Sequence, residues 1–362
     1  MMMGLVFVLA IYSGQFAPAA AAPGGGAALA SAEPIAEERA RDDLAELTQV
    51  VEEATAPGFA PAGPAIPPLP PTGATVTSPF GAQVTFAEAA EARAPFESDH
   101  AFDGFVGPMT DPIQAKDARS LTEARFVFLN NWAVPGTPVI GKGTYQVYAL
   151  QLRLALTDRL QIFADKDGIV RFSPNPGKSV TGLANLAAGA KYVIVRDVEN
   201  QFLFTGAVQY EPPTGYANIY QHHGSGLLGV YGIFAKQFMD DWHVSGQFGQ
   251  NIAVQNQQTG YFYTQLHVDR RFGKFVPFFE TSWFYYNQSA HYLPASVGME
   301  GAGFLNLGTS GFTGNSIVTL APGFKYDVSK HLELGVCYQF PVSDQHKSLY
   351  GNQLLAEVIF RY

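Results

Sequence analysis

The chain has 362 residues, of which 15% are charged and 13% are aromatic, and its formal net charge is −9. The negative charge argues against nucleic acid as a partner, and the single cysteine, Cys337, excludes an internal disulfide and a metal site built from several cysteines. Beyond the amino terminus no stretch approaches the roughly 18 consecutive apolar residues of a transmembrane helix, so this composition suits a membrane β-barrel or a soluble all-β protein.

The amino terminus is typical of a secretory signal. Residues 4–12 form a short apolar core, and small residues follow it. Ala30, Ser31 and Ala32 form a suitable cleavage site, so we expect residues 1–32 to be a signal peptide. No Lys or Arg precedes the apolar core, which is atypical of such signals.

Three different segments are expected before the first long strand. Residues 33–55 are predicted to be helical, and their apolar 4-3-4-3 spacing fits either a short coiled-coil seam or a solvated tether helix. Residues 56–73 form a Pro-rich, semi-rigid linker. Residues 74–122 are irregular, and they could plug a barrel or lie beneath it on the periplasmic side.

Residues 123–362 break into alternating runs rich in aromatic and β-branched residues, which predict strands. We expect twelve, an even number, with lengths suited to tilted membrane spans. The predicted strands are 123–134, 143–157, 160–172, 182–197, 201–211, 227–238, 242–254, 261–273, 275–287, 316–328, 331–343 and 354–362.

The connections between these runs alternate strictly between short and long. Short turns such as 158–159 and 329–330 alternate with long loops such as 212–226 and 288–315. Outer-membrane barrels have short periplasmic turns and longer outer loops, whereas a soluble sandwich has no reason to sort its loops by length. The fold class is therefore predicted as all-β, a twelve-stranded antiparallel transmembrane barrel in the cell outer membrane, surrounded by lipid.

Alternation along the strands assigns charged residues to a lumen. The expected lumen or pore-lining residues are Arg125, Arg153, Lys191, Glu211, His267, Asp269, Arg271, Glu280, Lys325, Asp327, Glu333 and Glu357. Arg270 breaks the pattern and falls on the apolar face near a strand end. The two signs of charge nearly balance, which fits either a water-filled channel with a mixed wall or a closed interior in which the charges pair.

The carboxyl-terminal strand ends on an aromatic residue. Phe360 and Tyr362 lie on its apolar face, and Arg361 lies on the other. This tail resembles the signal that the bacterial barrel-assembly machinery reads, so we expect that machinery to be a partner.

The region 123–362 as a whole looks like a bacterial outer-membrane barrel. Within that class it resembles uncharacterised porins of the phenol meta-pathway type, through the segments LTDRLQIFADKDG (156–168) and YDVSKHLELGVCYQFPV (326–342). Each consists of a strand end, a polar turn and a return strand, a loose pattern that many barrels share.

Motifs that suggest chemistry are few. His243 and Ser245, two apart on a strand, resemble the pair of outer-membrane phospholipases, with Asn251 as the available orienting residue, but the site would lie at the wrong end of the barrel. Residues 165–168 (DKDG) fit a polar turn or bulge better than a calcium loop. His222 and His223 lack an evident third metal ligand. We therefore expect no catalytic residues, no metal and no cofactor.

The sequence predicts a porin-like channel for passive diffusion of small solutes. The alternative is a non-conducting structural or adhesion barrel whose outer loops bind a partner. The number of strands does not decide between a channel and a closed barrel. Twelve lies between eight strands, which leave no channel, and about sixteen, which leave an open one.

Overall fold

The computed structural model describes residues 75–77, 83–85 and 94–362. The expected signal peptide, helical segment and linker lie outside these ranges. The chain divides into two units, residues 1–88 and 89–362. In the first, β1 (Thr75–Thr77) and β2 (Gln83–Thr85) form an antiparallel pair.

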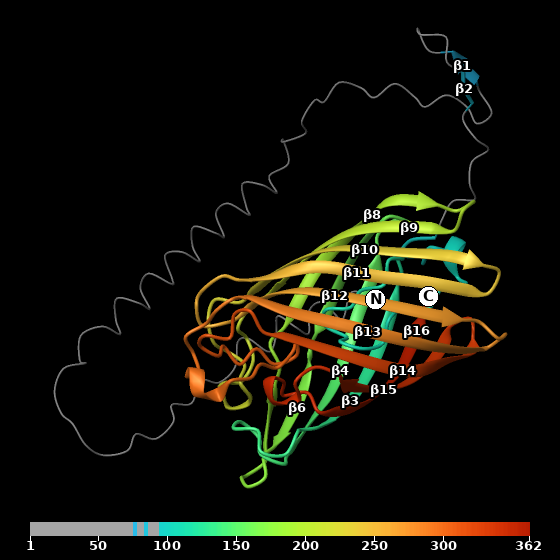
Figure 1. Cartoon of the computed structure of the whole chain (residues 1–362). Helices are drawn as coiled ribbons and strands as arrows, with labels where there is room; N and C mark the ends of the chain where they lie inside the picture. Colours follow the sequence, from blue (N-terminus) through green and yellow to red (C-terminus); the bar gives the residue numbers. More distant parts are fainter. Residues whose placement is uncertain (1–74, 78–82, 86–93) are drawn as a thin grey trace, which may run out of the picture. The chain divides into compact units, whose positions relative to one another are not determined.

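The second unit is a closed antiparallel barrel, which Figure 1 shows from the side. Its strands are β3 (Glu123–Trp132), β4 (Thr144–Ala155), β5 (Leu160–Lys166), β6 (Gly168–Ser173), β7 (Val180–Leu183), β8 (Ala187–Asp197), β9 (Phe202–Glu211), β10 (Leu227–Met239), β11 (Trp242–Ala253), β12 (Gly260–Arg270), β13 (Phe275–Gln288), β14 (Ser316–Ser329), β15 (Leu332–Pro341) and β16 (Asn352–Arg361). Because β3 pairs with both β4 and β16, the sheet closes on itself. β5 with β6 and β7 with β8 each make one interrupted span, so the predicted twelve-stranded barrel is confirmed.

The first interruption corrects the continuous strand expected over 160–172. The register with β4 shifts by one residue between the pairs Leu152–Ala164 and Ala149–Gly168. This is a β-bulge, and one extra residue turns two consecutive side chains to the same face. Asp165 and Lys166 are both buried inside the barrel as a result. Of the polar turn or bulge expected at DKDG, the structure has the bulge.

The second interruption corrects the strand expected over 182–197. β7 pairs only with β6, whereas β8 pairs with β5 and β9. The loop 212–226 fills the space beside β7, where the Tyr216 N–H donates to the Leu183 carbonyl. Asn185, in the break, accepts from the N–H groups of Gly215 and His222 at 2.9 and 3.2 Å. At the break between β7 and β8, hydrogen bonds to the Asn185 side chain therefore take the place of backbone ladder bonds.

Short turns and long loops separate to opposite ends of the barrel (Figure 1). The turns 240–241 and 330–331 lie at one end, and the loop 289–315 lies at the other. In barrels of this class the end with short turns faces the periplasm. The predicted alternation of connections is therefore present, and the first and last spans both reach the periplasmic end.

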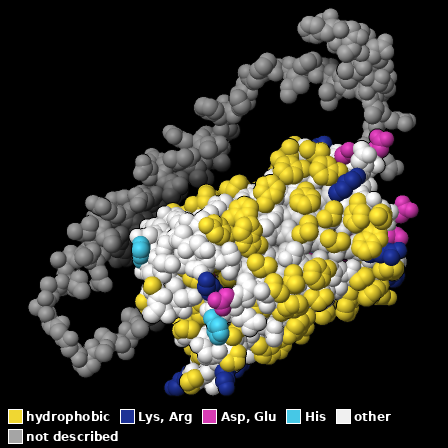
Figure 2. Space-filling view, viewed as in Figure 1, with side chains coloured by type: hydrophobic (Ala, Val, Ile, Leu, Met, Phe, Trp, Pro, Cys, Tyr) yellow, Lys and Arg dark blue, Asp and Glu magenta, His cyan; other side chains and the backbone are white. Residues whose placement is uncertain are grey.

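The outer wall is apolar, and its charges gather toward the two ends of the visible face (Figure 2). Exposed large side chains include Phe126, Tyr148, Leu152, Ile162, Phe248 and Val336. Arg270 faces outward near a strand end, where its guanidinium lies over Trp242 and Phe272. A closed barrel leaves no unpaired edge, and an apolar wall of this size needs lipid around it. The protein is an integral β-barrel of the outer membrane.

Residues 94–122 run from the periplasmic end into the lumen and back. They include the 3₁₀ turn η2 (His100–Phe102), and most side chains from 105 to 121 are buried. We call residues 104–121 the plug. It makes no β-ladder with the wall. No helix among the described residues is long and apolar enough to cross a membrane.

Candidate functional site

The lumen is the candidate site, and the plug is held in it by polar wall residues. The carboxylate of Glu280, on β13, accepts the backbone N–H groups of Met109 and Thr110, both at 2.8 Å. Gln247, on β11, accepts the Lys116 N–H at 2.9 Å. Gln151, on β4, donates to the Pro112 carbonyl at 2.8 Å. Irregular backbone inside a barrel needs such partners, because no water-rich surface is available to it.

A group of ion pairs lies in the periplasmic half of the lumen. The Lys325 ammonium is 2.9 Å from Glu333 and 2.7 Å from Glu357. Arg125 also pairs with Glu357, at 2.5 Å, and donates to the Met109 carbonyl of the plug. All four wall side chains are buried. Their charges therefore compensate one another with little solvent.

A second group of ion pairs joins the plug to β3–β5. Arg153 pairs with Glu123 at 2.6 Å and lies 3.5 Å from Asp165. Asp165 also accepts the plug's Lys116 at 2.8 Å. Within the plug, Arg119 and Asp117 pair at 2.6 Å. Burial alone would raise the pKa of the Asp117 carboxyl. The neighbouring Arg119 guanidinium outweighs burial and holds that pKa far below its usual range. The plug's own charges are thus neutralised inside the lumen.

A third cluster alternates carboxylates with imidazoles. The two ring nitrogens of His267 lie 2.8 Å from Glu280 and 3.2 Å from Asp269. Asp269 in turn is 2.8 Å from Nδ1 of His243. The His243 ring packs on Phe105 of the plug, with 4.7 Å between centroids. A neutral imidazole donates only one hydrogen bond, so contact with two carboxylates favours a cationic His267.

The structure places all the predicted lumen residues on the inner face. Those that are buried are Arg125, Arg153, Lys191, Glu211, His267, Asp269, Glu280, Lys325, Glu333 and Glu357. Arg271 and Asp327 pair with each other at the periplasmic mouth, where their side chains are 22% and 25% exposed. Glu211 lies apart, at the outer end, where it pairs with Lys166 and accepts from Asn185.

Two kinds of charged lumen residue do not follow from the alternation of the strands. Lys116, Asp117 and Arg119 lie in the plug, where no period-2 pattern marks an inward face. Asp165 and Lys166 both face inward because of the bulge, whereas alternation allows only one of two neighbours to do so. The Asp-Lys-Asp-Gly run was the available signal for that bulge.

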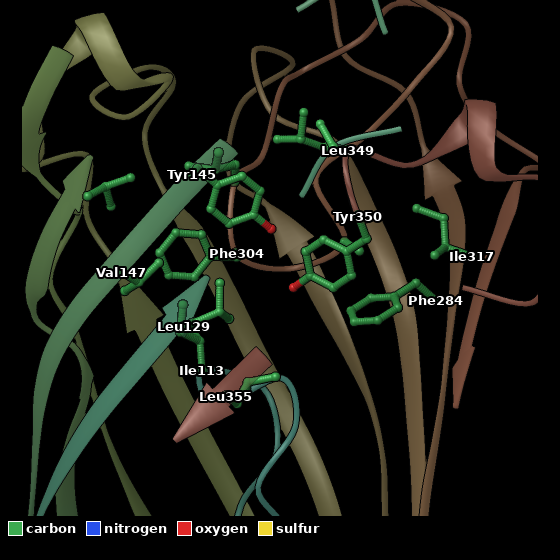
Figure 3. Packing of buried hydrophobic residues seen from close by; sticks show 14 of the residues in the cluster. Ile113, Leu129, Tyr145, Val147, Phe284, Phe304, Ile317, Leu349, Tyr350 and Leu355 are labelled. Atoms are coloured by element: carbon green, nitrogen blue, oxygen red, sulfur yellow. The ribbon is translucent and has the colours of Figure 1, made fainter. Parts of the chain in front are cut away.

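An apolar and aromatic cluster fills much of the outer half of the lumen (Figure 3), beside the buried Glu211–Lys166 pair. Tyr145 of β4 and Phe304 of the long outer loop lie nearly parallel, with 5.9 Å between ring centroids. Phe284 and Tyr350 lie on another side of the same cluster. Ile113, at the inner tip of the plug, joins it. The plug and the outer loop thus meet across this cluster.

The interior is closely filled. One cavity between the plug and β3–β5 measures about 10 Å³, room for about one water molecule. A groove of about 560 Å³ on the outer wall, lined by residues such as Phe126, Tyr148 and Ile169, faces lipid. A larger cavity of about 330 Å³ lies at the periplasmic mouth, beside Arg271, Asp327 and Glu333.

The motifs that suggested enzymatic or metal chemistry have structural partners. His243 contacts Asp269 and Phe105, while Asn251 instead accepts the Tyr231 hydroxyl at 2.7 Å. His223 stacks on Tyr292 with 4.3 Å between centroids. In the ranges that the structure describes, no group of three or more His, Cys, Asp or Glu is arranged to hold a metal.

Comparisons with known proteins add little beyond the fold. No family model and no curated protein matches the chain. Among solved structures, the COG4313 outer membrane channel from Pseudomonas putida F1 is similar, with 14% identity, a TM-score of 0.49, and coverage of 71% of this chain and 100% of that one. The KdgM porin (9%, TM-score 0.41, 66% and 99%) and the NanC porin (9%, TM-score 0.43, 67% and 100%) are also similar. These low values assign no function, and the phenol meta-pathway resemblance stays a prediction.

Proposed function

We propose that the protein is a channel for passive diffusion of small amphipathic solutes, which opens when the plug moves. The observation that carries this proposal is the way in which the plug is attached. It is held by side-chain contacts such as those of Glu280 and Gln247, and not by strand pairing. The plug can therefore leave without disrupting the closed ladder of the wall.

The two linings of the lumen suggest the class of solute. A solute entering from outside meets a lining that is mostly aromatic and aliphatic, with the Glu211–Lys166 pair as its charged part, and meets the charged residues of the periplasmic half afterwards. An amphipathic molecule can satisfy both surfaces, whereas an ion would be poorly solvated in the outer half. The predicted lumen residues would line the pore once the plug has moved, and their opposite charges would act in pairs, without a net sign.

The competing function is a non-conducting barrel whose outer loops bind a partner. The closely filled interior and the compensated ion pairs are what favour it. In that case the plug would be a permanent core, and the loop 289–315 would supply the binding surface. Conductance separates these two functions.

The test is planar-bilayer conductance of the purified, folded protein and of a variant lacking residues 33–122. Steps from the truncated barrel, with few or none from the full chain, are the expected result. Glu280→Gln should raise the opening frequency of the full chain, because the plug loses a charged acceptor at residues 109–110. Glu199→Gln, in an exposed periplasmic turn, is the matched control. A correctly folded truncated barrel that never conducts would exclude the channel.

We further propose that Phe360 and Tyr362 form the signal for the barrel-assembly machinery. Both side chains are more than half exposed on the lipid side, while Arg361 lies within 3.1 Å of Glu123 inside. Tyr362→Ala should lower the amount of inserted barrel in cells while keeping the backbone contacts of residue 362 to Ser98 and Thr122. Tyr338→Ala, another exposed lipid-facing aromatic, is the control. Equal insertion of both variants would contradict a special role for the terminus.

A further inference from the structure

The outer loop 289–315 places a hairpin, residues 300–309, in the mouth of the barrel. Phe304, Leu305 and Leu307 of this hairpin are buried. The Gly303 carbonyl accepts from Gln114 of the plug at 3.0 Å. The hairpin therefore closes the lumen from outside, as the plug closes it from the periplasm.

The Glu300 carboxylate lies at the base of this hairpin, which Asn306 also connects to Thr259 of a neighbouring loop. Glu300 is fully buried and accepts the backbone N–H groups of Leu307 at 2.8 Å and Thr309 at 2.7 Å. Among the described residues no Lys, Arg or His lies within ion-pairing distance of it. A buried carboxylate compensated only by backbone dipoles is costly to keep ionised.

The elements packed around Glu300 offer no compensating charge. From β13, the Tyr286 hydroxyl accepts the Ala302 N–H at 3.1 Å. The loop 342–351 contributes backbone groups, since the Glu300 N–H donates to the Lys347 carbonyl and its carbonyl accepts from Leu349. The loop 254–259 contributes the Thr259 hydroxyl, whereas the Gln114 amide of the plug contacts the hairpin at the Gly303 carbonyl. Tyr286 is the titratable side chain that faces the carboxylate from these neighbours.

The hairpin is bounded by residues that permit it to move. Gly298 has φ 61° and Gly311 has φ 66°, a conformation that glycine adopts at little cost. A side chain at Gly298 would meet no atom within 4 Å, so this hinge lies in open space. Rotation about these two points would break the hydrogen bonds of the hairpin to Tyr286, Thr259 and Leu293, but not the ladder between β13 and β14.

We propose that Glu300 is a proton sensor, and that hairpin 300–309 closes the outer mouth when this carboxyl is protonated and releases it when the carboxyl is ionised. This regulation rests on the proposed channel function, because it controls the same lumen.

The direction of the pH response follows from the two states of the carboxyl. Burial raises the pKa of Glu300 from 4.5 to about 7 in the closed hairpin. In a released hairpin the carboxyl meets water, and its pKa returns to its ordinary value. The closed form therefore binds the proton more tightly. Protonation therefore raises the ratio of closed to open hairpin. This contribution is complete below about pH 4.5, falls by up to about tenfold per pH unit as the pH rises toward 7, and is absent above that value.

Thiol labelling measures this opening without relying on conductance. In a Cys337→Ser background, Ala302→Cys places a probe at a position that is 1% exposed in the closed hairpin. Ala217→Cys, at an exposed outer-loop position, corrects for the pH dependence of thiol chemistry itself. The corrected labelling rate with a small methanethiosulfonate should rise on the order of 100-fold between about pH 5 and pH 8.

Two matched substitutions identify the sensor. Glu300→Gln keeps an acceptor oxygen without charge, so the corrected rate should stay low and independent of pH. Glu199→Gln should keep the full response. A response that survives in Glu300→Gln, or a flat response with Glu300 present, would overturn the proposal.

Conductance recorded on the same preparations separates this inference from the channel itself. A pH-dependent labelling rate in a barrel that never conducts would leave the sensor in place and remove the channel. Conductance with a pH-independent labelling rate would support the channel and exclude the sensor.

Discussion

The two halves of the lumen are filled by different physical means. In the periplasmic half, ion pairs join wall strands to one another, as at Lys325 with Glu333 and Glu357, and join the plug to the wall, as at Lys116 with Asp165. In the outer half, wall and hairpin meet through aromatic and aliphatic contacts, as between Tyr145 and Phe304. Both halves are buried, so burial alone does not determine which kind of contact a barrel interior uses.

Because of this difference, the plug and the outer hairpin are released at different energetic costs. Ion pairs in a dry interior are costly to break singly, because one partner remains charged and buried. Breaking apolar contacts costs free energy in proportion to the apolar area that becomes exposed, and it leaves no buried charge behind. The Asp117–Arg119 pair can move with the plug, but Lys116 must leave Asp165 on the wall. Release of the plug is therefore expected to cost more than release of the outer hairpin, which breaks no ion pair.

The largest effect that would test this comparison is expected at Lys325. Lys325→Met leaves Glu333 and Glu357 buried with less compensation, so the free energy of unfolding should fall by about 3–5 kcal/mol. Urea-induced unfolding in detergent or lipid vesicles, followed by the heat-modifiable migration of the folded barrel, measures it.

The control for this prediction removes the carboxylate that loses its lysine partner. Adding Glu333→Gln to Lys325→Met should restore most of the lost stability, because Glu357 keeps Arg125 as its partner and no carboxylate of this group remains unpaired. If the double variant is as unstable as the single one, packing and not charge holds the periplasmic half.

The arrangement of the wall could be predicted from the sequence because strands place alternate residues on opposite faces. That rule alone places the pairs Arg125–Glu357 and Lys325–Glu333 on one surface. It does not show that a plug fills the lumen, because contacts such as Glu280 with Thr110 join positions 170 apart in the chain.

Apolar lumen residues were also beyond that rule. Tyr145 and Leu129 face inward, yet an apolar residue in an alternating strand reads equally well as a lipid contact. Their inward neighbours are supplied by the outer loop and the plug, whose irregular backbones carry no periodic signal. The interruption at 184–186 depends on the Asn185 side chain replacing ladder bonds, a local substitution that propensity does not reveal.

An intermediate effect is expected in the outer half. Ile317 is fully buried in the apolar cluster (Figure 3), so Ile317→Val should lower the free energy of unfolding by about 0.5–1.5 kcal/mol. The loss should be unchanged between low and high salt, because no charge is involved. Unfolding curves at two salt concentrations measure this, and a salt-dependent loss would show that the two halves are not independent.

The smallest effect is expected at the periplasmic mouth. Arg271 and Asp327 form a pair whose side chains are 22% and 25% exposed, and water and salt screen such pairs strongly. Arg271→Ala should therefore cost about 0–1 kcal/mol at low salt and less at high salt. A loss as large as that of Lys325→Met would mean that the mouth belongs to the same dry network as the periplasmic half. Arg271 would then belong with the desolvated ion pairs of the lumen, and charges screened by solvent would begin only beyond it, at the membrane surface.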